Sequence, residues 1–177
     1  FLADQGAYLV NCDEIVHSLL NPSTREGQEV IALLGDAILG EHDLNREQIS
    51  KLVFRDQKNL DKLEEILHPK VLQVVENEYE QACIDGRARC FVCEVPVLNK
   101  EVQAFGWDLT CLIQASNQVA KQRYIEANRG SEEKFFKIIQ RQEKLFKRHM
   151  PEPVISIIND GNLQELEQKA GQILQTL

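Results

Sequence analysis

The chain has 177 residues, of which 43% are hydrophobic and 27% are charged, and this composition is that of an ordinary globular protein able to bury a core. Its formal net charge of -8 argues against general DNA or RNA binding, which depends on clustered Lys and Arg. No apolar run approaches the roughly 18 residues that a membrane-spanning helix requires.

The opening residues FLADQGAYL contain none of the charged, apolar and cleavable regions of a signal peptide. Because the chain starts at Phe1 rather than at Met, we expect the natural start of the protein to lie upstream. The five cysteines are an odd number, which favours reduced thiols and a cytoplasmic protein over a disulfide framework.

Cys90 and Cys93 have the CxxC spacing that occurs in zinc and redox sites. No second CxxC and no HxxxH completes a metal site in the sequence. In a strand, two residues three positions apart point to opposite faces. The pattern therefore favours packed, apolar cysteines over zinc or redox chemistry.

In chain order, FLADQG is the expected end of a helix with Gly6 as its stop, AYLVN is a strand, and DEIVHSLL is a helix. Helices follow in STREGQEVIALLG, in the second half of EHDLNREQISKLVF, in residues 57–67 and in residues 68–86, where Pro69 suits the first turn. Unbroken apolar runs predict strands in ARCFVCEVPVL, WDLTCLIQA and PVISIIND. Further helices are predicted in SNQVAKQRYIEAN, in SEEKFFKIIQRQEKLFKRH and from Leu163 to Leu177.

Strands separated by helices indicate a parallel sheet in an α/β domain. Residues 24–86 carry no strand pattern and are expected to form a helical insertion. Ligands of such sheets bind beyond the carboxyl ends of the strands, where VNCD, CEVPVLNK and IINDG stand in this chain. These strand ends are the best functional clue in the pattern.

Asp13 follows the first strand and has two compatible interpretations. It can cap the following helix, which the pattern alone favours, or it can act as a general base that accepts a proton from an attacking hydroxyl. His17 lies one helical turn later and is either a phosphate contact or a structural histidine. His68, expected at a junction between two helices, has a capping or packing role or a substrate contact.

A basic set stands out in the C-terminal half of this acidic chain. Its members can close over a polyphosphate, or they can form a solvated face balanced by glutamates. The set comprises Lys121, Arg123, Arg129, Lys134, Lys137, Arg141, Lys144, Lys147 and Arg148. The NDG triplet at 159–161 either holds a nucleotide base through its backbone or is only a turn.

Taken together, VNCDEIVHSLLNP, the LVF and LEEILHP segments, VCEVPVL and VISIINDG resemble the dephospho-coenzyme A kinase family, in the same order and over essentially the whole chain. The resemblance implies one kinase-like domain with a three-layer parallel sheet of the P-loop kinase type. Its expected parts are a core at 1–23, 87–115 and 150–177, a helical coenzyme A-side insertion at 24–86, and a lid with flanking helices at 116–149.

The same resemblance implies that the γ-phosphoryl group of ATP is transferred, with Mg²⁺, to the ribose 3'-hydroxyl of 3'-dephospho-coenzyme A, the last step of coenzyme A biosynthesis. It implies Asp13 as the general base. On the substrate side it implies Asn11, His17, Arg46, His68, Pro96 and Leu98. On the ATP side it implies Arg129, Asn159 and Gly161, and it assigns no metal ligand within this chain. Neither a nucleic acid nor a membrane is an expected partner.

Four departures from the family pattern keep two alternatives open. No G-x-x-x-x-G-K-[ST] loop occurs, so we expect that the ATP-binding loop is missing and that the chain as given is inactive. Asn11 replaces the first acid of the turn, Lys100 stands where Glu is usual, and Ala127 occupies the lid arginine position, which Arg129 then fills with a shift of two residues. The alternatives are a catalytically degenerate binding protein for dephospho-coenzyme A or a nucleotide, and another nucleoside or nucleotide kinase of the same fold.

Overall fold

The computed structural model describes residues 1–96, 100–127, 130–149 and 152–176. The chain divides into two compact units, one formed by Gly6–Pro96 and the other by Phe1–Gln5 with Val97–Leu177. Each unit contains a pair of parallel strands, which confirms the predicted α/β class with parallel strands. That the whole chain forms one kinase-like domain stays a prediction.

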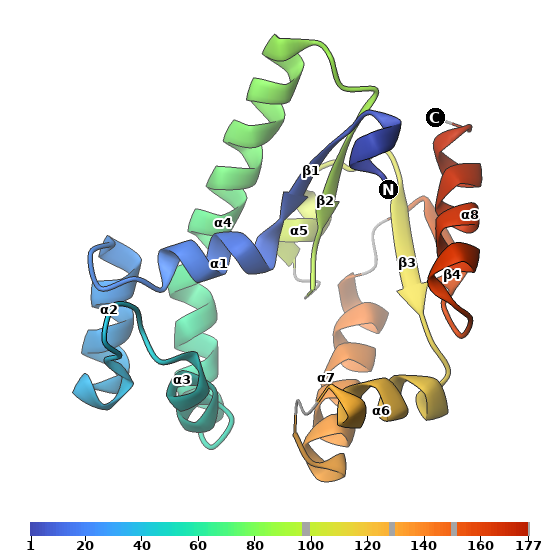
Figure 1. The fold of residues 1–177 in the computed structure, drawn as a ribbon. Helices are drawn as coiled ribbons and strands as arrows, with labels where there is room; N and C mark the ends of the chain where they lie inside the picture. Colours follow the sequence, from blue (N-terminus) through green and yellow to red (C-terminus); the bar gives the residue numbers. More distant parts are fainter. Residues whose placement is uncertain (97–99, 128–129, 150–151, 177) are drawn as a thin grey trace. The chain divides into compact units, whose positions relative to one another are not determined.

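The unit Gly6–Pro96 begins and ends with strands that lie side by side (Figure 1). Its elements are β1 Ala7–Asn11, α1 Cys12–Leu19, α2 Arg25–Leu34, the 3-10 helix η2 Asp36–Ile38, α3 Arg46–Val53, α4 Gln57–Asp85 and β2 Cys90–Glu94. In the β1–β2 register, Ala7 lies opposite Cys90 and Asn11 opposite Glu94. The predicted absence of strands from 24 to 86 is confirmed, apart from a single bridge between Leu39 and Leu44.

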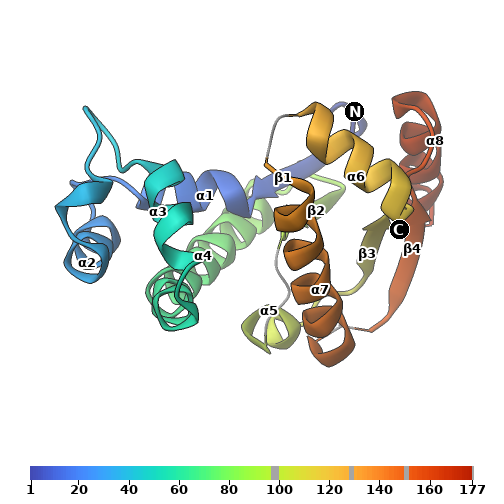
Figure 2. The ribbon, with the colours of Figure 1, turned by 90° about the horizontal axis from the view of Figure 1, so that it is seen from below.

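The long helix α4 is the element on which the rest of this unit packs. Helices α1, α2 and α3 contact it, and so do β1 and β2, as Figures 1 and 2 show from two directions. Val30, Ile38 and Val75 are fully buried where α2, η2 and α4 form the helical core. At the strands, the Tyr8 hydroxyl donates to Glu78 on α4 over 2.5 Å, and this bond raises the pKa of Tyr8 above its ordinary value.

The prediction of two helices at 57–67 and 68–86 is wrong, because α4 runs unbroken through both with Pro69 inside it. A proline in a helix interior removes one backbone hydrogen bond and crowds the preceding turn, which usually ends or kinks a helix. Here Leu67 and Val71 on either side of Pro69 are buried. Burial of this apolar face favours the continuous helix, because tertiary packing supplies most of a helix's stability in a protein.

The other unit starts with the 3-10 helix η1 Ala3–Gln5, after which Gly6 has a φ of 89° and turns the chain into β1. Its further elements are α5 Lys100–Ala104, β3 Thr110–Gln114, α6 Asn117–Glu126, α7 Glu132–His149, β4 Val154–Ile158 and α8 Leu163–Leu174. Strands β3 and β4 are parallel, with Thr110 opposite Val154 and Gln114 opposite Ile158. The four strands of the described residues therefore lie within the segments predicted from the sequence.

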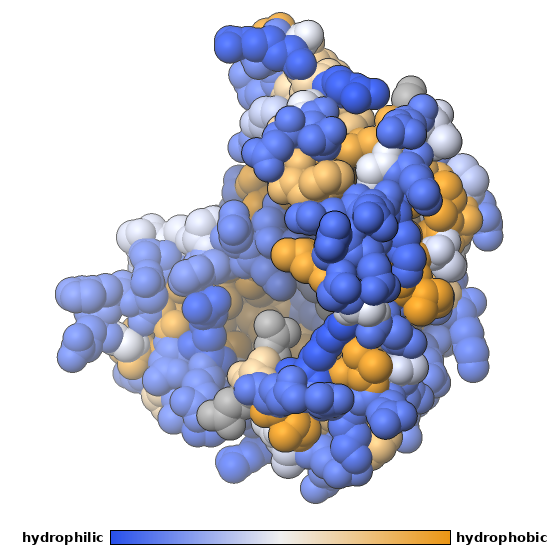
Figure 3. All heavy atoms as spheres, turned by 45° about the vertical axis from the view of Figure 1, so that its right-hand side comes forward, coloured by the Kyte–Doolittle hydropathy of each residue, from blue (hydrophilic) through white to orange (hydrophobic). Residues whose placement is uncertain are grey.

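The core of this unit includes Val102, Phe135 and Ile157, which are buried. The Trp107 indole donates to the carbonyl of Val102 over 2.8 Å, and its ring stacks on Phe105. The molecular face in Figure 3 is mainly hydrophilic, with hydrophobic side chains in separate groups. No helix in the described part of the chain is long and apolar enough to cross a membrane.

Candidate active site

The turn after β1 is organised by Asn11. Its Oδ1 accepts hydrogen bonds from the backbone N–H groups of Asp13, over 2.8 Å, and Glu14, over 3.3 Å, so Asn11 is the N-cap of α1. Its Nδ2 donates to Oε2 of Glu94, over 3.0 Å, at the end of the neighbouring strand β2. One side chain therefore joins the end of β1, the start of α1 and the end of β2.

The interpretation of Asp13 as the cap of α1 is wrong. The helix begins at Cys12, so Asp13 is its second residue and supplies one of the N–H groups that Asn11 caps. Within the described residues, no hydrogen bond or ion pair engages the exposed Asp13 carboxylate. A carboxylate in the first turn of a helix is favoured by the helix dipole. Asp13 thus presents an exposed carboxylate whose backbone is held by the cap from Asn11.

His17 lies one turn after Asp13 on α1, and both side chains are exposed. Residues four positions apart on a helix are neighbours on its surface. A ligand that contacts Asp13 is therefore within reach of His17 as well.

Two further candidates lie on α3 and α4. Arg46 is the first residue of α3, whose N-cap is Asn45, and it is exposed. His68 is half-buried in the middle of α4, immediately before Pro69. The prediction that His68 lies at a junction between two helices is wrong, because the helix continues through it. Helices α1 and α3 both contact α4.

The remaining candidates lie near the end of β2, in undescribed segments and in the turn after β4. Pro96 is exposed, two residues after β2 ends. Leu98 and Arg129 lie outside the described residues, so their predicted roles on the substrate side and in the lid stay predictions. Asn159 and Gly161 belong to the other unit and form a turn after β4.

The turn at 159–161 is held by an arginine that the sequence reasoning did not single out. Arg123 on α6 donates from Nη1 to the carbonyl of Asn159 over 2.6 Å and from Nη2 to the carbonyl of Gly161 over 2.8 Å. The Asn159 N–H donates to the carbonyl of Gln114 at the end of β3, over 2.7 Å. The planar guanidinium suits such a two-pronged contact, which a lysine cannot reproduce.

Two more contacts brace the same turn. Asp160 accepts a hydrogen bond from the backbone N–H of Ser116 over 2.7 Å, and Lys169 donates to the carbonyl of Ile158 over 2.6 Å. Because β3 and β4 are parallel neighbours, the helix that follows β3 starts beside the turn that follows β4. That topology is the signal that selects Arg123 from the basic set.

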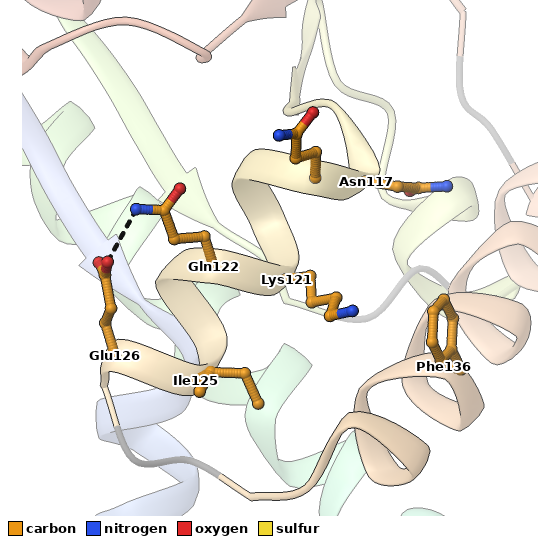
Figure 4. Close-up of a pocket in the computed structure, with 7 residues that line it drawn as sticks. Asn117, Lys121, Gln122, Ile125, Glu126 and Phe136 are labelled. Atoms are coloured by element: carbon orange, nitrogen blue, oxygen red, sulfur yellow. Dashed lines mark hydrogen bonds between the residues drawn. The ribbon is translucent and has the colours of Figure 1, made fainter.

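An open groove of about 650 Å³ lies along α6 and α7 (Figure 4). It is lined by Asn117, Gln118, Lys121, Gln122, Ile125, Glu126 and Phe136. Lys121 forms an ion pair with Glu132 over 2.7 Å, and Lys137 forms one with Glu133 over 2.7 Å. These two members of the basic set therefore behave as parts of a charge-balanced, solvated face.

The cysteines form a contact that the CxxC spacing did not indicate. The sulfur of Cys93 lies 3.5 Å from the sulfur of Cys12, the first residue of α1. All five cysteines are free thiols. Among the described residues, no three His, Cys, Asp or Glu side chains gather into a group that could hold a metal ion.

Comparison with known proteins identifies relatives of the whole chain. A family model described as dephospho-CoA kinase matches residues 1–165. The dephospho-CoA kinase of Chlamydia muridarum is 37% identical, over 97% of this chain and 85% of that protein. The dephospho-CoA kinase of Protochlamydia amoebophila is 32% identical, over 99% of this chain and 87% of that protein.

Two solved structures have the same fold. The crystal structure of a Thermus thermophilus protein matches with a TM-score of 0.71 at 24% identity, over 99% of this chain and 87% of that one. Dephospho-CoA kinase from Campylobacter jejuni matches with a TM-score of 0.62 at 17% identity, over 98% and 86%. With the family model covering most of the chain and relatives more than 30% identical along it, this protein belongs to the dephospho-CoA kinase family.

Proposed function

We propose that this protein transfers the γ-phosphoryl group of ATP to the ribose 3'-hydroxyl of 3'-dephospho-coenzyme A and so produces coenzyme A, in the last step of its biosynthesis. The observation that carries the proposal is the family match over residues 1–165. The proposal includes a three-layer fold of the P-loop kinase type, with residues 24–86 on the coenzyme A side and residues 116–149 as the lid and its flanking helices.

Asp13 is the proposed general base. Its carboxylate accepts the proton of the 3'-hydroxyl while that oxygen bonds to the γ-phosphorus and the bond to the β-phosphate oxygen breaks, releasing ADP. The supporting geometry is the exposed, unengaged carboxylate at the start of α1 and the cap from Asn11 that holds its backbone. His17 is the proposed second contact for the acceptor, one helical turn away.

The other roles follow the family positions. On the acceptor side we propose Arg46, His68, Pro96 and Leu98. On the ATP side we propose Arg129 together with the turn formed by Asn159 and Gly161. The Arg123 contacts support the second assignment, because a backbone that recognises a nucleotide base has to be held rigidly.

Mg²⁺ is part of the proposed reaction, in which it would offset negative charge on the phosphates. Mg²⁺ is usually bound by one or two carboxylates together with substrate phosphates rather than by a protein cage. The described residues form no such cage, and we derive no step of the mechanism through the metal. The 177 residues contain no G-x-x-x-x-G-K-[ST] loop.

The test is a kinase assay on the protein expressed from the complete coding sequence. With 3'-dephospho-coenzyme A and ATP, we expect coenzyme A with its new phosphate at the 3' position, identified by mass spectrometry and phosphorus NMR. Binding of dephospho-coenzyme A without ATP consumption would instead support a degenerate binding protein. Faster phosphorylation of another nucleoside or nucleotide would support the other kinase alternative.

Asp13→Asn tests the assigned base. We expect kcat to fall by about 10²–10⁴-fold, the usual contribution of a general base, while the KM for ATP stays nearly unchanged. Glu14→Gln is the matched control, because Glu14 is the next residue of the same helix turn and is also exposed. Full activity of Asp13→Asn would reject the base assignment.

A further inference from the structure

Two thiols meet where the carboxyl ends of β1 and β2 lie together. Cys93 lies opposite Val10 in the β1–β2 register, and Cys12 follows Val10 by two residues. Cys12 is the first residue of α1, directly after β1 ends at Asn11, so the contact joins the start of this helix to the end of the neighbouring strand β2. The two sulfur atoms are 3.5 Å apart, and Cys12 exposes 7% of its surface while Cys93 is half-buried.

The contact changes the acidity of both thiols in opposite directions. The hydrogen bond from Cys93 lowers the pKa of Cys12, although burial and the nearby carboxylates of Asp13 and Glu94 act against this effect. The same bond and burial raise the pKa of Cys93. A thiolate, not a thiol, is the nucleophile, so the lowered pKa favours Cys12 as the attacking sulfur and the raised pKa favours Cys93 as its partner thiol.

The pair is also adjacent to the proposed base. Cys12 lies between the cap Asn11 and Asp13, and Cys93 precedes Glu94, which accepts the hydrogen bond from Asn11. A disulfide has a sulfur–sulfur distance of about 2.05 Å, so bond formation would draw the two sulfurs together by roughly 1.5 Å. For a disulfide to affect the turn, part of this movement has to fall on the backbone at the start of α1 and the end of β2.

We propose that Cys12 and Cys93 are an oxidation site at which a hydroperoxide forms a disulfide, and that this disulfide slows phosphoryl transfer by displacing the turn that carries Asp13. The formation of the disulfide is independent of what the enzyme phosphorylates. The effect on turnover rests on the proposed function.

The chemistry balances with hydrogen peroxide as the oxidant. The Cys12 thiolate attacks one peroxide oxygen, the O–O bond breaks, and Cys12 becomes a sulfenic acid while hydroxide leaves. The Cys93 sulfur then attacks the sulfur of Cys12, the S–O bond breaks, and the proton of Cys93 leaves with the oxygen as water. The two thiols lose two electrons in total, and the peroxide is reduced to hydroxide and water.

The direct test is disulfide mapping of the full-length protein after titration with hydrogen peroxide, alkylation and digestion. We expect a cross-link between the peptides that contain Cys12 and Cys93, formed before the exposed Cys83 is oxidised and reversed by dithiothreitol. Trypsin leaves Cys90 and Cys93 in one peptide, so fragment ions or the Cys90→Ser variant are needed to assign the bond. Oxidation of Cys83 without this cross-link would overturn the proposal and leave the pair as packed side chains.

Activity provides the second readout. A displacement of about 1 Å at a reacting group typically costs on the order of 100-fold in rate, so we expect a loss of that size that dithiothreitol restores. Cys93→Ala should lose the cross-link and the sensitivity to peroxide, whereas Cys83→Ser should retain both. A complete cross-link with unchanged turnover would overturn the effect on catalysis. If the reduced protein makes no coenzyme A, the proposed function fails while the mapping still decides the oxidation site.

Discussion

Replacing Asn11 by alanine removes both contacts that join the end of β1 to α1 and β2. The loss of an N-cap side chain costs about 1 kcal/mol. The exposed bond to Glu94 adds roughly 0.5–1 kcal/mol, because solvent screens the charge that it faces. The free energy of unfolding should therefore fall by about 1.5–2 kcal/mol, which corresponds to a decrease in Tm of roughly 3–8 °C for a chain of this size.

Two matched variants separate the contacts. Asn11→Ser keeps an oxygen that can cap α1 but loses the donor to Glu94, so it should lose only about 0.5–1 kcal/mol. Asn11→Asp also keeps a cap but places a carboxylate 3.0 Å from that of Glu94, where the asparagine donor now lies. Repulsion raises the folded-state pKa of one of these carboxyls, so the penalty is absent below about pH 4 and grows as the pH rises.

The assay is urea unfolding followed by circular dichroism at pH 7 and pH 4. We expect the order wild type, Asn11→Ser, Asn11→Ala at both pH values, and an Asn11→Asp midpoint that approaches wild type only at pH 4. Equal midpoints for wild type and Asn11→Ala would refute the cap. A serine variant as unstable as the alanine variant would show that the Glu94 bond, not the cap, supplies the stability.

Two other substitutions test the structure at distant points. Arg123→Lys keeps a cation, but a lysine cannot contact the carbonyls of Asn159 and Gly161 together, so we expect the KM for ATP to rise several-fold with kcat nearly unchanged. The control Lys137→Met should change neither KM nor kcat. A wild-type KM in Arg123→Lys would contradict the positioning role of Arg123. Pro69→Ala restores a backbone donor inside α4 and should raise the free energy of unfolding, measured by urea titration, by about 1–3 kcal/mol. The expected gain is smaller than the cost of about 3 kcal/mol for proline in a helix interior, because alanine makes the unfolded chain more flexible. A lower urea midpoint would mean that the ring of Pro69 packs favourably.

The strands and most helices could be predicted because their signals are local. The runs around Val10, Val92, Leu112 and Ile157 are continuous and apolar, and each became a strand. The start of the helix after β1 is harder to predict from the sequence, because a shift of one or two residues changes which side chain faces the free N–H groups. Asn11 rather than Asp13 occupies that position, and only the backbone geometry settles the choice.

The sequence by itself determined the α/β class, the helical stretch from 24 to 86, the acid at the end of β1 and the resemblance to dephospho-coenzyme A kinases, since these depend on local spacing and motif order. Tertiary structure decided the continuity of α4 through Pro69, the clamp of Arg123 on the turn at 159–161 and the contact between Cys12 and Cys93. The last two join residues 36 or more positions apart. Such contacts are set by strand register and helix packing, which bring together side chains that no local pattern relates.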